Sequence, residues 1–273
     1  MRESPPEPDD IAGRARAAVY PAYDRQLGPL GHRAMEALSV RPGDRILDLG
    51  CGAGGTCLEL AQKVGPGGEV LGIDLSAAVL ETACRRSLGQ TSISFVQGDA
   101  QIFPFRREYF DAAFSRFGVM FFADPVTAFA NILCALKPGG RLSFVCWRSL
   151  EENEVDVVPL RAAYPDMAQL RPHPSAAQPF SFARQEKIQD VLSKAGYRDI
   201  AIAGYNDAVS CGDLESTLEL VLQCGSLGKI MRESPQLRPA IIEPVRKALA
   251  PHDVENKIWL NAATWIVSAR KPH

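Results

Sequence analysis

The residues of this chain that are best suited to chemistry are glycines and carboxylates that follow short apolar runs. The run 46–49 has Asp48 near its end, and Gly50, Gly52 and Gly55 follow it. Glycine lets the backbone turn tightly and approach a ligand with no Cβ in the way. A buried strand, a glycine turn and then a helix-like segment form the local plan of a nucleotide-binding βα unit.

Two further carboxylates stand in comparable places. Asp74 closes the apolar run 69–74, and Asp99 follows the run 93–97. Parallel strands bring their carboxyl ends to one edge of a sheet, where open α/β folds bind ligands. Each acid alone could be an ordinary turn or helix-start residue. Three acids at successive strand ends beside a glycine loop favour a shared ligand.

The position of the first acid narrows the class of ligand. Gly50, Gly52 and Gly55 match a dinucleotide fingerprint, and Asp74 stands about where the ribose-binding acid would be. A pyrophosphate prefers backbone N–H groups and a helix N-terminus, without a carboxylate close by. Asp48, two residues before the first glycine, better suits a ligand with positive charge. S-adenosylmethionine is such a ligand, since it carries an ammonium, a sulfonium and a nucleoside.

Each acid can be given a role toward that ligand. Asp48 is expected to hold the methionine α-amino group, directly or through water, above the backbone of residues 50–54. Asp74 is expected to accept hydrogen bonds from both ribose hydroxyls. Asp99 would accept from the adenine amine, and the Ala100 N–H would donate to a ring nitrogen. The predicted cofactor-binding residues are Asp48, Gly50, Cys51, Gly52, Asp74, Leu75, Asp99, Ala100 and Ser115.

With these motifs, the chain resembles the class I S-adenosylmethionine-dependent methyltransferases of the small-molecule kind, and is similar to the ubiquinone/menaquinone methyltransferase-like family. The resemblance rests on residues 46–54, 72–76, 98–100 and 136–140, and it covers about residues 30–147. It implies an α/β fold: a doubly wound, Rossmann-like, seven-stranded sheet whose last strand is antiparallel, with helical cap and lid elements.

The remaining segments are expected to serve this core. Strands and helices alternate through residue 147, which predicts right-handed crossovers and a parallel sheet. Residues 1–40 are interpreted as an N-terminal leader and lid helices. Residues 41–273 are interpreted as the methyltransferase domain, with acceptor-side insertions at about 148–180 and 211–256, which match no general motif of the family.

Several local features make testable predictions. The helical segment 11–40 should be interrupted near Pro21 and at residues 28–29. Ser76 can cap the following helix with its hydroxyl. Asp124 before a proline marks another helix start. Residues 257–270 are expected to form one long strand.

The end of the fourth predicted strand faces the place where a methyl acceptor must come. Arg116 either holds an acceptor carboxylate or pairs with a neighbouring side chain, and the apolar residues near it either line a pocket or pack the next helix. No general base is identified by a motif. The candidate catalytic residues are Arg116, His173 and Tyr23. The predicted acceptor pocket consists of Tyr20, Arg116, Phe117, Met120, Phe121 and Trp147.

Composition excludes several other classes of partner. The formal net charge of -2 gives no basic footprint for nucleic acid. The Asn/Asp-Pro-Pro-Tyr signature of nucleic-acid amino methylases is absent at residues 115–118, which favours a small-molecule acceptor. No metal-ligand spacing is found, so no metal is predicted. The chain shows no membrane-spanning run and no signal peptide at its start, and its seven cysteines are scattered, which is typical of a reduced, cytoplasmic protein. A homodimer is left open.

The leading hypothesis is an S-adenosylmethionine-dependent methyltransferase that acts on oxygen, nitrogen or carbon of a small, partly apolar metabolite in quinone or natural-product biosynthesis. One alternative is a nicotinamide-dependent oxidoreductase, which would bind NADH instead. Another is a non-catalytic S-adenosylmethionine-binding protein, which would have no acceptor pocket. Asp48 and Asp99 speak against the oxidoreductase.

Overall fold

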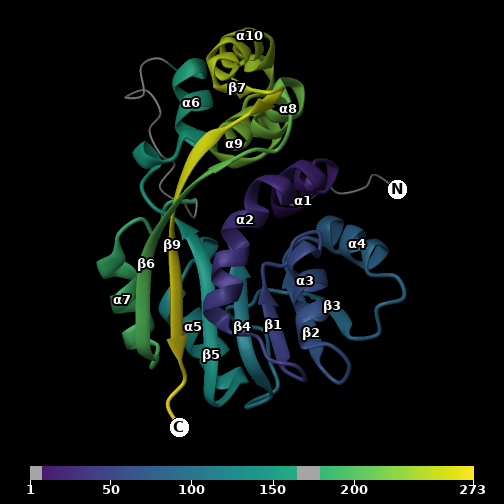
Figure 1. Ribbon diagram of the computed structural model, residues 1–273, viewed down its shortest axis with the longest axis vertical. Coiled ribbons are helices and arrows are strands. Elements are labelled where there is room, and N and C mark those ends of the chain that lie inside the picture. Colours follow the sequence, from purple (N-terminus) through teal and green to yellow (C-terminus); the bar gives the residue numbers. More distant parts are fainter. Residues whose placement is uncertain (1–7, 165–178) are drawn as a thin grey trace.

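A computed structural model describes residues 8–164 and 179–273. Its centre is one seven-stranded sheet (Figure 1). In order across the sheet the strands are β3 (Ile93–Gln97), β2 (Glu69–Asp74), β1 (Arg45–Leu49), β4 (Phe110–Arg116), β5 (Leu136–Trp147), β9 (Leu260–Arg270) and β6 (Arg198–Val209). The first five are parallel to one another, and β9 is antiparallel to both of its neighbours. The predicted fold class is therefore confirmed, including the antiparallel last strand.

The central strands are mainly apolar because helices cover both faces of a parallel sheet. Ile46 to Leu49 are almost completely buried, and so are Ala112 to Ser115 of β4. The flanking helices are α2 (Tyr20–Leu38), α3 (Gly55–Val64), α4 (Ala77–Arg86), α5 (Pro125–Ala135) and α7 (Gln185–Lys194), and α1 (Pro8–Ala18) packs on α4. Helix α2 packs across β4, β5 and β9, whereas α3 and α4 pack near β1, β2 and β3.

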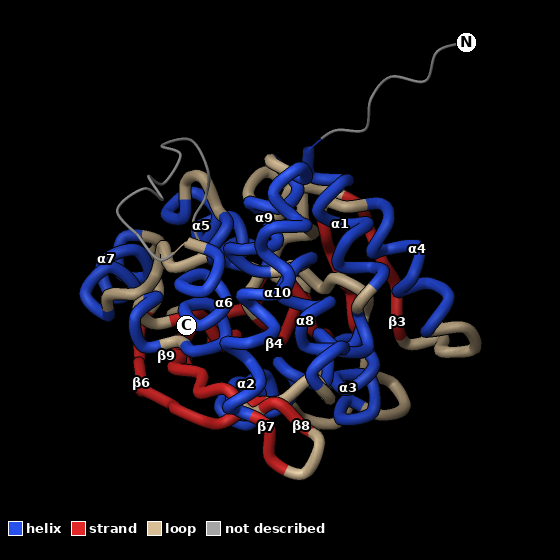
Figure 2. Tube along the Cα trace, turned by 90° about the horizontal axis from the view of Figure 1, so that it is seen from above, coloured by secondary structure: helices blue, strands red, loops and turns tan. Residues whose placement is uncertain are grey.

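A second group of helices lies beyond the carboxyl ends of the parallel strands. We call these the cap helices: α6 (Glu154–Ala163), α8 (Leu214–Gln223), α9 (Gly225–Glu233) and α10 (Arg238–Leu249). They pack on one another, with the short hairpin of β7 (Asp253–Val254) and β8 (Lys257–Ile258) beside them (Figure 1). Seen from above, α6, α8 and α10 lie over the middle of the sheet (Figure 2). The cap helices therefore lie at the carboxyl ends of the strands in the middle of the sheet.

The N-terminal helices differ from the prediction in one respect. The chain breaks at Val19, next to the predicted Pro21, but α2 then continues through Gly28 and Pro29 without interruption. Pro21 lies at the start of α2, where its missing N–H costs nothing. Pro29 is tolerated because the apolar face of α2 is buried against the sheet, and packing of such a face outweighs local propensity.

Three other local predictions have mixed outcomes. The Asp124 carboxylate caps α5 by accepting from the Thr127 N–H (3.1 Å), as predicted. Ser76 stands at the N-cap of α4, but its hydroxyl makes no capping hydrogen bond, so this prediction is wrong. The strand predicted over residues 257–270 is divided at Trp259 into β8 and β9, because residues 257–258 pair with β7.

A membrane-spanning helix needs about 20 mainly apolar residues. None of the described helices combines such a length with such a composition.

Candidate active site

The glycine loop after β1 depends on backbone angles that glycine adopts easily. Gly50, Gly52 and Gly54 have φ values of 67°, 55° and 78°. Gly50 also lies against the loop after β4, because a Cβ placed on it would be 2.9 Å from the Cα of Gly118. Helix α3 begins at Gly55, so its free N–H groups face this loop.

Gly50→Ala is expected to destabilise the protein by roughly 1–3 kcal/mol, because it adds left-handed strain and a backbone clash. Gly28→Ala is a suitable control, since a Cβ on Gly28 would meet nothing within 4 Å. Gly28→Ala should raise the free energy of unfolding slightly, by about 0.5–1 kcal/mol, because alanine favours the helix. Urea unfolding of both variants tests this, and equal unfolding free energies would contradict a constrained loop.

Asp48 is completely buried at the end of β1. Its Oδ2 accepts hydrogen bonds from the Thr56 hydroxyl and from the Cys57 thiol (Sγ–Oδ2 3.1 Å). Its Oδ1 is buried with no hydrogen-bond partner among the described residues. Burial raises the pKa of Asp48 to about 6, against the opposing effect of these two hydrogen bonds and of Arg116. A cation placed at Oδ1 would stabilise the charged form.

Asp74 is held in place by backbone groups on either side. Oδ2 accepts from the Gly52 N–H and Oδ1 from the Ser76 N–H, both at 3.0 Å. A carboxylate has about four acceptor positions, so both oxygens keep capacity for further donors. The neighbouring Leu75 side chain is 51% exposed, an apolar surface beside the acid.

Asp99 and Ala100 follow β3 at the same edge. Asp99 Oδ1 accepts from the Gln101 N–H at 2.9 Å, and the Gln101 side-chain amide also reaches the carboxylate. Asn131 of α5 donates to the Ala100 carbonyl oxygen at 3.0 Å. The parallel register places the ends of β1, β2 and β3 side by side, so the structure brings the three predicted acids to one edge.

The hydroxyl of Ser115 is already used by the fold. It is completely buried, donates to the Leu49 carbonyl (2.8 Å) and accepts from the Gly118 N–H (3.1 Å). Ser115 therefore joins the ends of β1 and β4. Any contact that Ser115 makes with the methyl donor would have to come from its backbone atoms. Cys51 is 4% exposed, so it too would contribute mainly through the backbone.

Asp24 of α2 lies beside the glycine loop, although the sequence alone gave it no role. A Cβ on Gly55 would lie 2.6 Å from Asp24 Oδ2, so this carboxylate rests on the start of α3. Asp24 forms ion pairs with Arg116 (2.5 Å) and Arg86 (2.9 Å). Arg86 also donates to the Ala53 carbonyl in the glycine loop (2.7 Å). Of the two alternatives for Arg116, the structure shows pairing with a neighbour.

The acceptor-side residues separate into two groups. The rings of Phe117 and Trp147 stack with centroids 4.1 Å apart, at the ends of β4 and β5. Tyr20 lies elsewhere, since its ring carries the Arg86 guanidinium at 4.4 Å, on the glycine-loop side. Phe121 is 43% exposed.

Met120 and Tyr23 have more defined surroundings, and His173 lies outside the described residues. Met120 is buried with its sulfur against the Trp147 N–H (3.3 Å). Burial raises the pKa of Tyr23 to about 12, with Cys224 adding to the shift. A phenol with that pKa stays protonated at neutral pH, so Tyr23 can donate a hydrogen bond there but not serve as a ready base.

A cavity of about 50 Å³ lies between α2, the end of β5 and the cap helices. It is mainly apolar and includes one carboxylate. Its lining residues are Tyr23, Gln26, Leu27, Trp147, Val155, Asp156, Pro159, Leu220, Val221, Cys224, Gly225 and Leu227. Because Trp147 and Tyr23 are among them, the cavity adjoins the end of β5 and the turn of α2 that carries Asp24.

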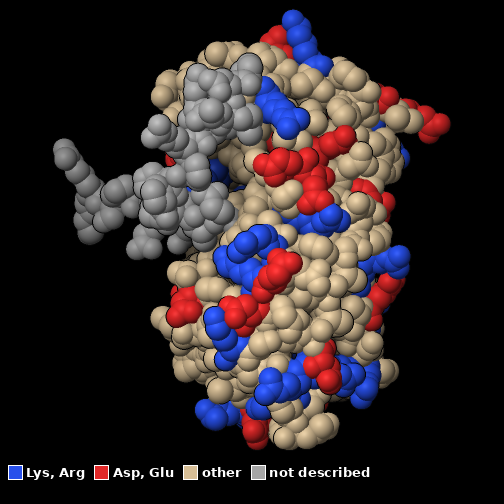
Figure 3. Space-filling view, turned by 90° about the vertical axis from the view of Figure 1, so that its left-hand side faces the viewer, with Lys and Arg blue, Asp and Glu red and all other residues tan. Residues whose placement is uncertain are grey.

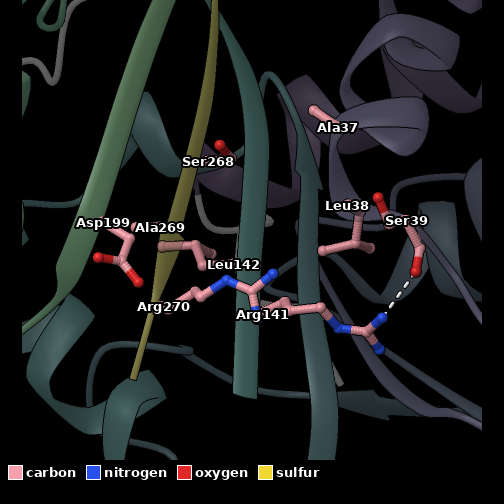
Figure 4. A pocket seen from close by; sticks show the side chains of 9 residues that line it. All are labelled: Ala37, Leu38, Ser39, Arg141, Leu142, Asp199, Ser268, Ala269 and Arg270. Carbon is pink, nitrogen blue, oxygen red and sulfur yellow. Dashed lines mark hydrogen bonds between the residues drawn. The ribbon is translucent and has the colours of Figure 1, made fainter. Parts of the chain in front are cut away.

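A second cavity of about 70 Å³ lies at the opposite end of the sheet (Figure 4). Figure 4 shows Arg141 reaching Ser39, whose carbonyl oxygen accepts its hydrogen bond at 2.6 Å. Arg141 also pairs with Asp44 (2.5 Å). This cavity adjoins the paired ends of β5 and β9 at residues 141 and 270, away from the glycine loop. It is therefore not part of the candidate site.

Charged side chains of both signs are interspersed over the face of the molecule shown in Figure 3. Among the described residues, no group of three or more His, Cys, Asp or Glu side chains has a metal-binding arrangement.

Residues 46–140 match the family described as a methyltransferase domain. This match and the order of the strands in the sheet support a class I S-adenosylmethionine-dependent methyltransferase. Among curated proteins, demethylmenaquinone methyltransferase of Staphylococcus aureus strain JH9 is 28% identical over 189 residues, which cover 65% of this chain and 78% of that protein.

Solved structures show the same fold. A SAM-dependent methyltransferase from Aquifex aeolicus superposes with a TM-score of 0.52 and 18% identity over 70% of this chain and 89% of that one. A phosphoethanolamine N-methyltransferase 2 of Haemonchus contortus, in complex with phosphomonomethylethanolamine and S-adenosylhomocysteine, gives a TM-score of 0.60 at 20% identity. That match covers 97% of this chain but 60% of the Haemonchus chain.

Proposed function

We propose that this methyltransferase transfers a methyl group from S-adenosylmethionine to oxygen, nitrogen or carbon of a small, partly apolar metabolite. The observation that carries this proposal is the cavity lined by Trp147 at the end of β5 and by Tyr23, the neighbour of Asp24 in α2. A quinone-like or natural-product acceptor would fit an aromatic wall. The curated relative named demethylmenaquinone methyltransferase gives modest support to the quinone-like option.

The residues at the strand ends fit the methyl donor. The unpartnered Oδ1 of Asp48 is suited to the ammonium, because a buried carboxylate is costly until it is paired. The free capacity of Asp74 suits the ribose hydroxyls, and Leu75 offers an exposed apolar surface to the adenine. Asp99 is proposed to accept from the adenine amine. Arg86 and Arg116 are near enough to the loop to meet the methionine carboxylate.

When bound, the methyl donor supplies an activated methyl group on a positively charged sulfur. The protein then has to align the two reactants and exclude water, and such positioning can contribute about 7–11 kcal/mol. The stacked pair Phe117 and Trp147 would fix the plane of an acceptor beside the sulfonium, where an aromatic face also attracts positive charge.

The N-terminal helices are proposed to cover the methyl donor. Helix α1 packs on the start of α4, and a Cβ on Gly13 would overlap the Ser76 hydroxyl. Ser76 is two residues from Asp74. Tyr20 and Asp24 of α2 reach Arg86 next to the glycine loop. These contacts support a lid formed by α1 and the first turns of α2.

Calorimetry with S-adenosylmethionine, S-adenosylhomocysteine and NADH tests the donor side of this proposal. We expect both sulfur compounds to bind and NADH not to bind. Binding of NADH alone would support the oxidoreductase instead. A screen of catechols, hydroquinones and amines for release of S-adenosylhomocysteine then tests catalysis, and binding without turnover of any acceptor would favour a non-catalytic protein.

A further inference from the structure

The cap contains a buried carboxylate to which neither the methyl donor nor the fold of the central sheet gives a role. Asp156 of α6 is 8% exposed and lines the cavity beside Trp147. Its Oδ1 accepts from the Ser226 N–H at 2.9 Å, in the first turn of α9. Gly225 is required there, because a Cβ on it would lie 2.8 Å from this oxygen. The cap is thus built around the carboxylate.

Capping of α9 accounts for only part of this arrangement. One acceptor oxygen suffices for a cap, and an exposed Asp performs the same task at α8, where Asp213 accepts from the Ser216 N–H at 2.8 Å. Within the described residues, Asp156 forms no ion pair with Lys, Arg or His. Burial raises the pKa of its carboxyl, and the hydrogen bonds from Ser226 only partly offset this. A buried carboxylate without a cation is costly unless a ligand completes its hydrogen bonds.

The rest of the cavity wall offers such a ligand mostly apolar contacts. Trp147, Leu220 and Val221 provide apolar surface, and the side chains of Tyr23 and Gln26 line the same cavity. A pocket with an apolar body and one polar anchor typically sets the orientation of a small molecule. The combination describes a planar apolar molecule with one hydrogen-bond donor at its edge.

We propose that Asp156 is a specificity-determining residue that binds a hydroxyl or amine group of the methyl acceptor. The acceptor is then a small aromatic or similarly flat molecule that carries an O–H or N–H, with its ring on Trp147 and this group on the Asp156 carboxylate. The inference rests on the proposed function, because it assigns the cavity to the acceptor of that same reaction.

The test uses phenol and anisole as probes, since the oxygen carries a donor hydrogen in phenol and a methyl group in anisole. Binding to the full chain, saturated with S-adenosylhomocysteine, is followed by NMR titration. Phenol should bind the unchanged protein about fivefold or more tightly than anisole, because a hydrogen bond to a charged group is stronger than one to a neutral group. Equal affinities would overturn the proposal, and this comparison needs no variant.

Asp156→Asn keeps an oxygen for the Ser226 N–H but loses the charge. It should reduce the preference for phenol to about twofold or less while anisole affinity stays unchanged. Asp213→Asn is the matched control, because it makes the same change at a helix cap outside the cavity. If Asp156→Asn weakens both probes equally, or if Asp213→Asn has the same effect, Asp156 is a structural cap and the inference fails.

The same samples separate this inference from the proposed function. Calorimetry with S-adenosylhomocysteine is run first. If it does not bind, the donor assignment fails. If it binds while phenol and anisole bind equally, only the role of Asp156 is wrong.

Discussion

Asp48→Asn should make the ligand-free protein more stable at neutral pH and at the same time weaken its binding of S-adenosylmethionine. The pKa of Asp48 is raised to about 6 in the folded state by burial, whereas an unfolded Asp titrates near 3.9. The folded state therefore holds a proton that the unfolded state has lost. Across this window, stability falls as the pH rises. The difference in pKa corresponds to a penalty on the order of 2–3 kcal/mol above about pH 7.

The variant removes this penalty because Asn carries no charge and can still accept the Thr56 and Cys57 hydrogen bonds with its amide oxygen. Urea unfolding at about pH 4, 5.5 and 7.5 should show the two proteins equally stable at the lowest pH and progressively different above it. Parallel stability curves would show that folding does not raise the pKa of Asp48.

Asp111→Asn provides a control of opposite sign. Burial of Asp111 is outweighed by hydrogen bonds from Lys137 and from the Arg45 N–H, so its pKa is lowered. Its charged form therefore stabilises the fold above the unfolded pKa, and that contribution is lost as the pH falls through the folded pKa. The Asn variant should be less stable than the parent protein at pH 7, and the difference should shrink in acid.

The binding part of the Asp48 prediction is measured by calorimetry. The ammonium of the ligand needs the ionised carboxylate, so affinity for S-adenosylmethionine should rise between about pH 5 and pH 7 in the parent protein. In Asp48→Asn the affinity should be lower and should lack this rise. An unchanged affinity at pH 7 would mean that the ammonium binds elsewhere.

Asp74→Ala is expected to weaken the binding of S-adenosylmethionine at least ~100-fold. The substitution would remove the two charge-assisted hydrogen bonds proposed between Asp74 and the ribose hydroxyls, each worth about 1.5–3 kcal/mol. It also frees the Gly52 and Ser76 N–H groups, which the carboxylate now orients. Asp74→Asn keeps one hydrogen-bond acceptor oxygen and should therefore lose less affinity than Asp74→Ala. Calorimetry gives both affinities, and an unfolding curve for each variant checks that the fold is intact.

An unchanged affinity in Asp74→Ala would show that the cofactor assignment is wrong. A loss of equal size for adenosine, which lacks the methionine part, would locate the effect at the nucleoside. A loss of affinity for S-adenosylmethionine but not for adenosine would instead show that Asp74 acts by holding the glycine loop in place.

The sequence revealed the residues whose signals are local. Asp48, Asp74 and Asp99 each end an apolar run, and parallel strands bring such ends to one edge without further information. The glycine loop was found for the same reason, because a turn that needs positive φ selects glycine at fixed spacing. The number of strands in the sheet and the antiparallel last strand followed from the resemblance to a family.

Residues that reach the site from distant segments gave no such signal. Asp24 lies on the start of α3 only because α2 packs across the sheet, and Asp156 borders the cavity only because α6 and α9 meet in the cap. Neither has a neighbour in sequence that marks it. Helix α9 was missed because glycines at 225 and 228 lower helix propensity, although Leu227 and Met231 bury one face. Pro29 had the opposite effect. It predicted an interruption of the helix, but α2 continues through it because packing overrides propensity.

The place of β9 has a consequence for how the chain is made. This strand follows both of its neighbours in sequence, yet it lies between β5 and β6 and pairs with each along most of its length. During synthesis, β6 and the nearby α7 leave the ribosome before the strand that attaches them to the sheet exists. Domains ordinarily begin to fold from the N-terminal part as they emerge. Here residues 45–147 can assemble early, whereas β6 can join the sheet only after residues 260–270 have been made.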